Sequence, residues 1–324
     1  MGMTDVATAI EQPAPPLLST QLGAASLQAV AIAGAVPAVR LELADTHRLT
    51  RPTLLQGMQP FQNGYLLAQA WKIPHGDIRQ PPGIQSSVFN RYDADGRFRS
   101  RMICVTAGHC STFSTSGPYV WLGWQKVDPN GDVTQRRIAR VRWRRGVVHD
   151  DDPDITFYDP HTHRSVTPYL DLDHGRIGLR EVDAEHRETY TLHDLDAFKR
   201  GIDEPLARVQ TTSRSTFQGW GCYGDRLWIL RGATWKPARL DEFRWGEDER
   251  VGRLELTPEL KAVKATSYEP EGVWVSRALE PVLHIGARFG STSKRRFLSF
   301  RVTELMAPPP AVPGSEEQGL QPEG

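Results

Sequence analysis

Five short segments rich in Val, Ile, Leu, Tyr and Trp recur along the chain at nearly regular intervals, and this repeat limits the possible folds more than any other feature. The segments are residues 65–69, 119–123, 176–180, 226–230 and 282–286. Their first residues lie 54, 57, 50 and 56 positions apart. Turn-forming residues such as Asn63-Gly64 precede most of them. Each segment is therefore predicted to be a β-strand that follows a tight turn.

A second strand-like segment follows each of these, at residues 88–92, 138–143, 189–193, 239–243 and 297–302. One repeat thus contains an inner strand, a turn, a middle strand, a loop and a further strand. A single meander of this kind cannot bury both of its faces, whereas five can stack face to face around an axis. The repeat predicts an all-β fold, a five-bladed β-propeller. Residues 39–43 are predicted to close the ring as the outer strand beside residues 297–302.

The segments outside the repeat differ from it in composition. Residues 1–38 are Ala-, Leu- and Pro-rich and are predicted to form an N-terminal arm or leader. Residues 39–306 form the predicted propeller. Residues 307–324 lack apolar periodicity and are predicted to be a disordered Pro/Gly/Glu tail. Two short helices are expected, one near residues 195–200 and one near 258–263.

Composition excludes several classes of protein. The 39 Lys and Arg residues balance 39 Asp and Glu residues, so no bulk attraction to nucleic acid is expected. The apolar stretch 29–39 is too short for membrane insertion. No basic residue precedes Arg40, so no signal peptide is expected and the protein is made in the cytoplasm. Three cysteines without metal-ligand spacing are interpreted as buried thiols: Cys104, Cys110 and Cys222.

Four polar residues fall at comparable places, at or just before the inner strands of different repeats: Gln59, His109, Gln218 and Glu271. Asp171 is a weaker counterpart in the third repeat. If the ring closes, these side chains can point towards the axis. His and Glu are able to ligate a divalent cation there, and Gln amides can hold hydroxyl groups. No cofactor is identified. The alternative is a water-filled channel without any ligand.

The other candidate site is a basic ladder in the second repeat, which contains Arg136, Arg137, Arg140, Arg142, Arg144 and Arg145. Arg140, Arg142 and Arg144 are predicted to share one face of a strand. Arginine forks match phosphate geometry, so a polyol-phosphate polymer is a candidate ligand. The alternative is a solvated strand face. The acidic run 150–154 that follows has carboxylates able to bind calcium, but it lacks EF-hand spacing and is interpreted as a solvated loop.

The tryptophans divide by position. Trp143 lies in a predicted strand and is expected in the core of a blade. Trp124 and Trp220 lie near strand ends and are candidates for stacking on sugar rings.

Several motifs resemble the β-propeller family shared by phage receptor-binding or baseplate proteins and the protein called teichoic acid biosynthesis protein C. They lie at residues 54–61, 89–109, 117–121, 217–224 and 269–273, and the likeness spans roughly residues 41–305. One departure is Cys110, where the family tends to have a glycine after its histidine. The resemblance implies a virion or phage-derived tail protein that contacts a bacterial surface.

The resulting hypothesis is a phage or phage-derived tail or baseplate recognition module, which binds a teichoic-acid-like cell-wall glycopolymer and other tail or baseplate proteins. A homo-oligomer is possible for such a protein. Motifs of hydrolases, metalloproteases, P-loop proteins and dinucleotide-binding enzymes are absent, which argues against an enzyme. Two alternatives stay open. One is a glycan or phosphodiester hydrolase with Glu271 and His109 in the channel, and the other is an intracellular interaction propeller.

Overall fold

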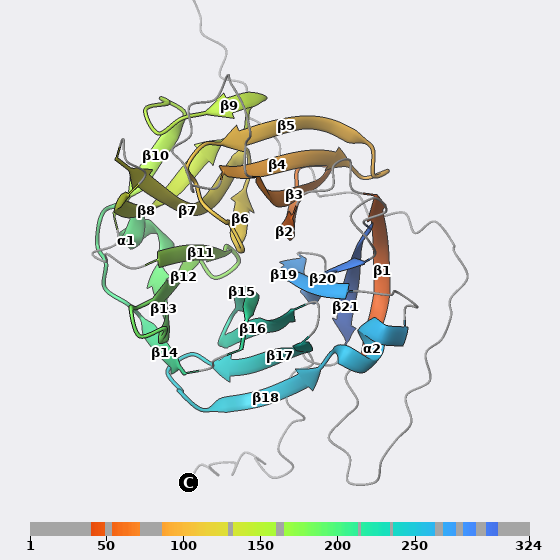
Figure 1. Cartoon of the computed structure of the whole chain (residues 1–324). Coiled ribbons are helices and arrows are strands. Elements are labelled where there is room, and N and C mark those ends of the chain that lie inside the picture. The colour runs from red at the N-terminus through yellow and green to blue at the C-terminus, as the bar shows by residue number, and fades with distance from the viewer. Residues whose placement is uncertain are drawn as a thin grey trace, which may run out of the picture.

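The computed structural model describes residues 40–48, 54–71, 86–128, 132–159, 165–212, 215–233, 236–262, 268–276, 281–289 and 296–303. Five β-sheets surround a common axis, as Figure 1 shows, and the predicted five-bladed propeller is confirmed. The predicted arm 1–38 and tail 307–324 lie outside the described residues.

Each blade is one sheet. Blade 1 contains β2 (Leu54–Phe61), β3 (Gly64–Trp71), β4 (Ser86–Asp93), β5 (Phe98–Cys104) and β9 (Gly146–Val148). Blade 2 contains β6 (Phe113–Ser116), β7 (Tyr119–Val127), β8 (Val133–Arg142) and β10 (Ile155–Tyr158). Blade 3 contains β11 (Ser165–Asp171), β12 (Arg176–Val182), β13 (Glu188–Asp194) and β14 (Ala207–Thr211). Blade 4 contains β15 (Phe217–Tyr223), β16 (Arg226–Ala233), β17 (Lys236–Arg244) and β18 (Arg250–Glu255). Blade 5 contains β19 (Tyr268–Ser276), β20 (Val282–Phe289), β21 (Arg296–Thr303) and β1 (Arg40–Arg48).

The repeat in the sequence corresponds to the second strand of every blade. The five recurring segments lie in β3, β7, β12, β16 and β20, and the segments that follow them lie in β4, β8, β13, β17 and β21. The first strands β2, β6, β11, β15 and β19 lie nearest the axis (Figure 1). The turn before β3 needs glycine, because a Cβ on Gly64 would overlap the carbonyl oxygen of Tyr92.

The ring closes as predicted. β1 pairs antiparallel with β21 of blade 5, with Leu41 opposite Val302 and Leu43 opposite Phe300. The last sheet therefore contains the first strand of the chain, and unfolding of blade 5 would require the ring to open. This pairing also covers the edge of β21, which would otherwise expose unpaired backbone groups.

Apolar clusters fill the spaces between adjacent sheets. Trp121, Trp124, Trp220, Trp228 and Trp274 are all at most 2% exposed. Trp124 and Trp220 are therefore core residues, and the expectation that they stack on sugars is wrong, because both lie within strands, β7 and β15, and pack into the apolar clusters. The three cysteines are buried and free, as predicted.

Both predicted helices are present. α1 (Leu195–Lys199) begins after Asp194, whose side chain accepts a hydrogen bond of 2.7 Å from the backbone N–H of Ala197. α2 is Thr257–Ala262. No helix in the described part of the chain is long and apolar enough to cross a membrane.

Candidate functional site

The axis candidates on the inner strands are buried. Gln59 on β2, Gln218 on β15 and Glu271 on β19 are 7%, 8% and 3% exposed. The side-chain amide of Gln218 donates a hydrogen bond of 2.8 Å to the carbonyl of Gly232, in its own blade. Part of the hydrogen-bonding capacity of Gln218 is thus used inside blade 4.

A β-bulge marks the equivalent position in three inner strands. The pairing register shifts at Gln56 in β2, at Gln218 in β15, and at Glu271-Gly272 in β19. The blade 1 counterpart of Gln218 and Glu271 is therefore Gln56, and not Gln59. A bulge inserts one extra residue into a strand, so spacing alone misassigns the position. A Gln-Gly or Glu-Gly pair occurs at all three bulges and was the available signal.

Glycine backbones of three blades meet at this level of the axis. A Cβ on Gly272 would lie 2.8 Å from the Cα of Gly57, and a Cβ on Gly219 would lie 2.9 Å from the Cα of Gly272. Gly272 also has φ of +86°, a left-handed conformation that favours glycine. The inner strands of blades 1 and 5, and those of blades 4 and 5, thus approach each other so closely at the bulges that glycine is needed there.

His109 is exposed in the loop between β5 and β6. The surrounding protein lowers its pKa by desolvation, and the carboxylate of Glu269 on β19 partly offsets this. Glu269 itself forms an ion pair with Arg288. Asp171 lies at the far end of its inner strand and accepts a hydrogen bond of 2.8 Å from the N–H of Gly224. It is therefore not the counterpart of the bulge residues. Within the described ranges, no three His, Cys, Asp or Glu side chains are arranged to hold a metal ion.

The arginine ladder is interrupted. Arg140 and Arg142 lie on one face of β8, and the guanidinium of Arg140 is 4.7 Å from the ring centre of Tyr119. β8 ends at Arg142, so Arg144 does not share that face and this part of the prediction is wrong. Arg144 instead pairs with Asp152 of the acidic run and donates a hydrogen bond of 2.8 Å to the carbonyl of Val147.

A cleft of about 440 Å³ lies where blades 1 and 2 meet. Blade 1 contributes residues of β4, of β5 and of the turn between β2 and β3, and blade 2 contributes the segment after β8. The charged and aromatic side chains that line the cleft are Arg91, Asp93, Arg99, Trp143, Arg144 and Arg145. Of these, Arg144 and Arg145 belong to the basic ladder identified from the sequence, whereas Arg91, Asp93 and Arg99 do not.

The segment after β8 is fixed to both blades. Trp143 lies beyond the end of β8 and is half-buried, so the expectation that it is a core residue of a blade is wrong. Its backbone N–H donates a hydrogen bond of 2.8 Å to the carbonyl of Pro118 in blade 2. The chain then crosses to blade 1, where β9 pairs in parallel with β5, and returns to blade 2 as β10. Figure 1 shows β9 beside β5 of blade 1. The segment is thus hydrogen-bonded to blade 2 at its start and paired with blade 1 at its end, which fixes the backbone positions of residues 143–145.

Two of the four arginines in the cleft are already paired. Arg99 pairs with Asp93, and Arg144 pairs with Asp152. Arg91 lies over the ring of Phe61, with its guanidinium 5.8 Å from the ring centre. Neither Arg91 nor Arg145 has a carboxylate partner among the residues that the structure describes. Arg144 also faces Asp154 at 4.0 Å, so Arg91 and Arg145 are the cleft arginines whose charge is not offset by a paired carboxylate in the described ranges.

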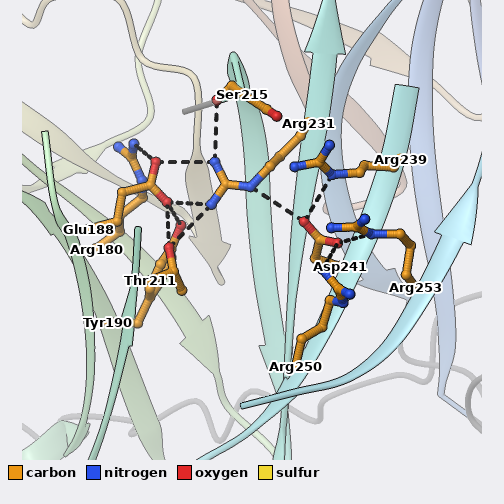
Figure 2. Close-up of polar contacts among 10 residues, drawn as sticks. All are labelled: Arg180, Glu188, Tyr190, Thr211, Ser215, Arg231, Arg239, Asp241, Arg250 and Arg253. Carbon is orange, nitrogen blue, oxygen red and sulfur yellow. Dashed lines mark hydrogen bonds and ion pairs between the residues drawn. The ribbon is translucent and has the colours of Figure 1, made fainter. Parts of the chain in front are cut away.

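A buried charge network joins blades 3 and 4, as Figure 2 shows. Glu188 on β13 accepts hydrogen bonds of 2.8 Å from Arg180 and 2.6 Å from Arg231 on β16. The guanidinium of Arg231 also faces Asp241 at 3.5 Å. Burial alone would raise the pKa of Glu188, but Arg180 and Arg231 outweigh it and lower the pKa to about 2. Glu188, Arg231 and Asp241 are each at most 5% exposed, so the ion pairs that link β13 to β16 are buried and hold the two blades together.

Sequence reasoning did not identify this network. The available signal was Arg231, which directly follows the apolar residues 227–230 in a strand buried on both faces. A charged residue at such a position needs a partner.

Comparison with known proteins gives a likeness of fold. No protein-family model and no curated protein matches the sequence. Among solved structures, the tail fibre of Staphylococcus aureus phage P68 is similar, with a TM-score of 0.63 and 17% identity over 82% of this chain and 53% of that chain. This chain thus spans about half the length of that tail fibre. Myxococcus xanthus glutaminyl cyclase matches 83% of this chain and 100% of its own, with a TM-score of 0.44 and 12% identity. At such identities the likeness concerns the fold alone.

Proposed function

We propose that this chain is the recognition propeller of a phage or phage-derived tail, and that it binds a cell-wall glycopolymer of the teichoic acid type. The single observation that carries the proposal is the five-bladed fold, which resembles the tail fibre of phage P68 over 82% of this chain. On this proposal the protein resides in the tail of a virion or phage-like particle and contacts other tail or baseplate proteins.

The distribution of charge supports such a role. The chain has no net charge, yet arginines gather where blades 1 and 2 meet. A protein of this kind is not attracted to polyanions in general but can recognise one locally. We propose two further contact regions for the polymer. One is formed by the axis residues Gln59, His109, Gln218 and Glu271, and the other by Arg140 and Arg142.

The proposal is tested by binding of the full-length protein to purified cell walls, before and after chemical removal of their teichoic acids. We expect the protein to sediment with intact walls and to remain in solution with stripped walls. Binding should weaken as salt is added, because the contacts involve charged groups. Failure to bind either preparation would refute the proposal, and equal binding to both would exclude the teichoic acid as ligand.

A further inference from the structure

We infer that the cleft between blades 1 and 2 binds the phosphate groups of a phosphodiester-linked polymer, and that Arg91 and Arg145 make the decisive contacts. This inference rests on the proposed function and assigns it a location. It differs from the axis region and from the face of β8 that carries Arg140 and Arg142, because the cleft combines Arg145, which lies beyond the end of β8, with Arg91 of blade 1.

The unpaired positive charges of the cleft favour an anionic ligand. Arg99 and Arg144 have carboxylate partners, whereas Arg91 and Arg145 have none within the described parts of the chain. Gathering uncompensated cations of like sign raises the energy of the free protein. An anion that enters the cleft removes this cost and gains charge-assisted hydrogen bonds at the same time.

The type of positive side chain in the cleft favours a phosphate group. All four positive side chains that line the cleft are arginines. A guanidinium presents parallel N–H donors that match two oxygens of a phosphate, whereas an ammonium group acts as a point charge. Arg91 is also oriented by the ring of Phe61, which is itself only 2% exposed. A guanidinium held against a buried ring loses less freedom when it binds.

An aromatic side chain, Trp143, also lines the cleft. Trp143 is half-buried and lies against Phe61, with ring centres 5.4 Å apart. Its remaining exposed surface adjoins the arginines. A ligand with alternating phosphates and carbon-rich sugar or polyol units would contact both kinds of surface. The volume of about 440 Å³ falls within the range of roughly 300–1,000 Å³ that is usual for small-molecule sites, so it suits a short segment of such a polymer.

A nucleic acid fits the cleft less well. Proteins that bind nucleic acids present an extended basic stripe and a basic domain overall. Here the chain is neutral overall, and the four arginines of the cleft are accompanied by Asp93. We therefore assign the cleft to a phosphodiester polymer of polyols or sugars.

The test compares Arg91→Gln and Arg145→Gln with Arg97→Gln in binding of the full-length protein to teichoic-acid-bearing walls. Arg97 is a matched control, since it lies in the same β4–β5 turn region, is 73% exposed and does not line the cleft. Glycerophosphoglycerol serves as a competitor, and uncharged diglycerol is its matched control. A melting curve of each variant establishes that the fold is intact, and Arg145 is exposed enough for its replacement to leave packing unchanged.

We expect wall binding to weaken about ten- to hundredfold in each cleft variant, the loss typical of a hydrogen bond to a charged group. Arg97→Gln should bind as the wild type, and only glycerophosphoglycerol should compete. If the wild type binds walls but the cleft variants bind equally well, or diglycerol competes equally, the inference is overturned while the proposed function stands. If the wild type binds no walls, the proposed function fails and the inference with it.

Discussion

Replacement of Glu188 by Gln should destabilise the protein by about 3–5 kcal/mol, the range found when one partner of a buried ion pair is removed. Glu188 is 5% exposed and Arg231 is 1% exposed. Without the carboxylate of Glu188, Arg231 keeps one carboxylate partner, Asp241 at 3.5 Å, and longer hydrogen bonds to Ser215 and Thr211. The pKa of Glu188 gives an independent figure. It falls from 4.5 to about 2 in the folded protein, and a difference of this size corresponds to about 3 kcal/mol.

The lowered pKa of Glu188 also makes the stability of the protein depend on pH. The folded-state pKa of Glu188 lies below its unfolded value, so the stabilisation is fully present above about pH 4.5 and disappears as the pH falls through about 2. Glu242 has the opposite sign, because burial raises its pKa despite the nearby Arg226. Glu242 is present in the wild type and in the Glu188→Gln variant. The difference between their free energies of unfolding at each pH therefore isolates the contribution of Glu188.

Urea unfolding at several pH values between 7 and 2, followed by tryptophan fluorescence, measures both quantities. The control is Glu185→Gln, because Glu185 is 66% exposed and pairs with an exposed arginine, so its loss should cost under about 1 kcal/mol. The two stability curves of wild type and Glu188→Gln should converge towards pH 2. If the Glu188→Gln protein is as stable as the wild type at pH 7, the network does not join the blades as argued.

Three further outcomes are expected. Gly272→Ala should lower the melting temperature strongly, because it combines strain of about 1–3 kcal/mol from its positive φ with a clash against the backbone of Gly57 in the neighbouring blade, whereas Gly117→Ala, also at positive φ but with open space around it, should have a smaller effect; equal effects would contradict the close approach of the blades. Truncation of residues 1–48 should lower the melting temperature by removing β1, while truncation of 1–38 should leave it unchanged; a loss of stability in the shorter truncation would show that the boundary at residue 38 is wrong. None of the three cysteines should react with a thiol reagent in the native protein at pH 8, since burial raises the pKa of Cys110 to about 12 and raises the others as well; rapid labelling before unfolding would contradict their burial.

The ring was predictable because the same short sequence pattern, a turn followed by an apolar strand, recurs in the blades. Turn residues such as Asn63-Gly64 precede a short apolar strand, and the spacing between blades varies little. Local signals of this kind do not depend on distant contacts, so pairing within a blade follows from the sequence. Closure by β1 was also predictable, since a ring needs an outer strand for its last blade and only one segment before blade 1 had the right pattern.

The cleft was not predictable for the opposite reason, because it arises where the chain departs from the repeat. Arg91 and Arg145 are far apart in the sequence and are brought together by β9, which spans only Gly146–Val148. A strand of three residues is too short to show an alternating pattern. Its sequence therefore does not indicate that β9 pairs with the neighbouring blade instead of with β8. The bulge at Gln56 was missed for a related reason, since one inserted residue alters the register without altering the composition. In a propeller, therefore, the regular strands specify the scaffold, and the links that break the pattern, such as residues 143–154, are where binding residues should be sought first.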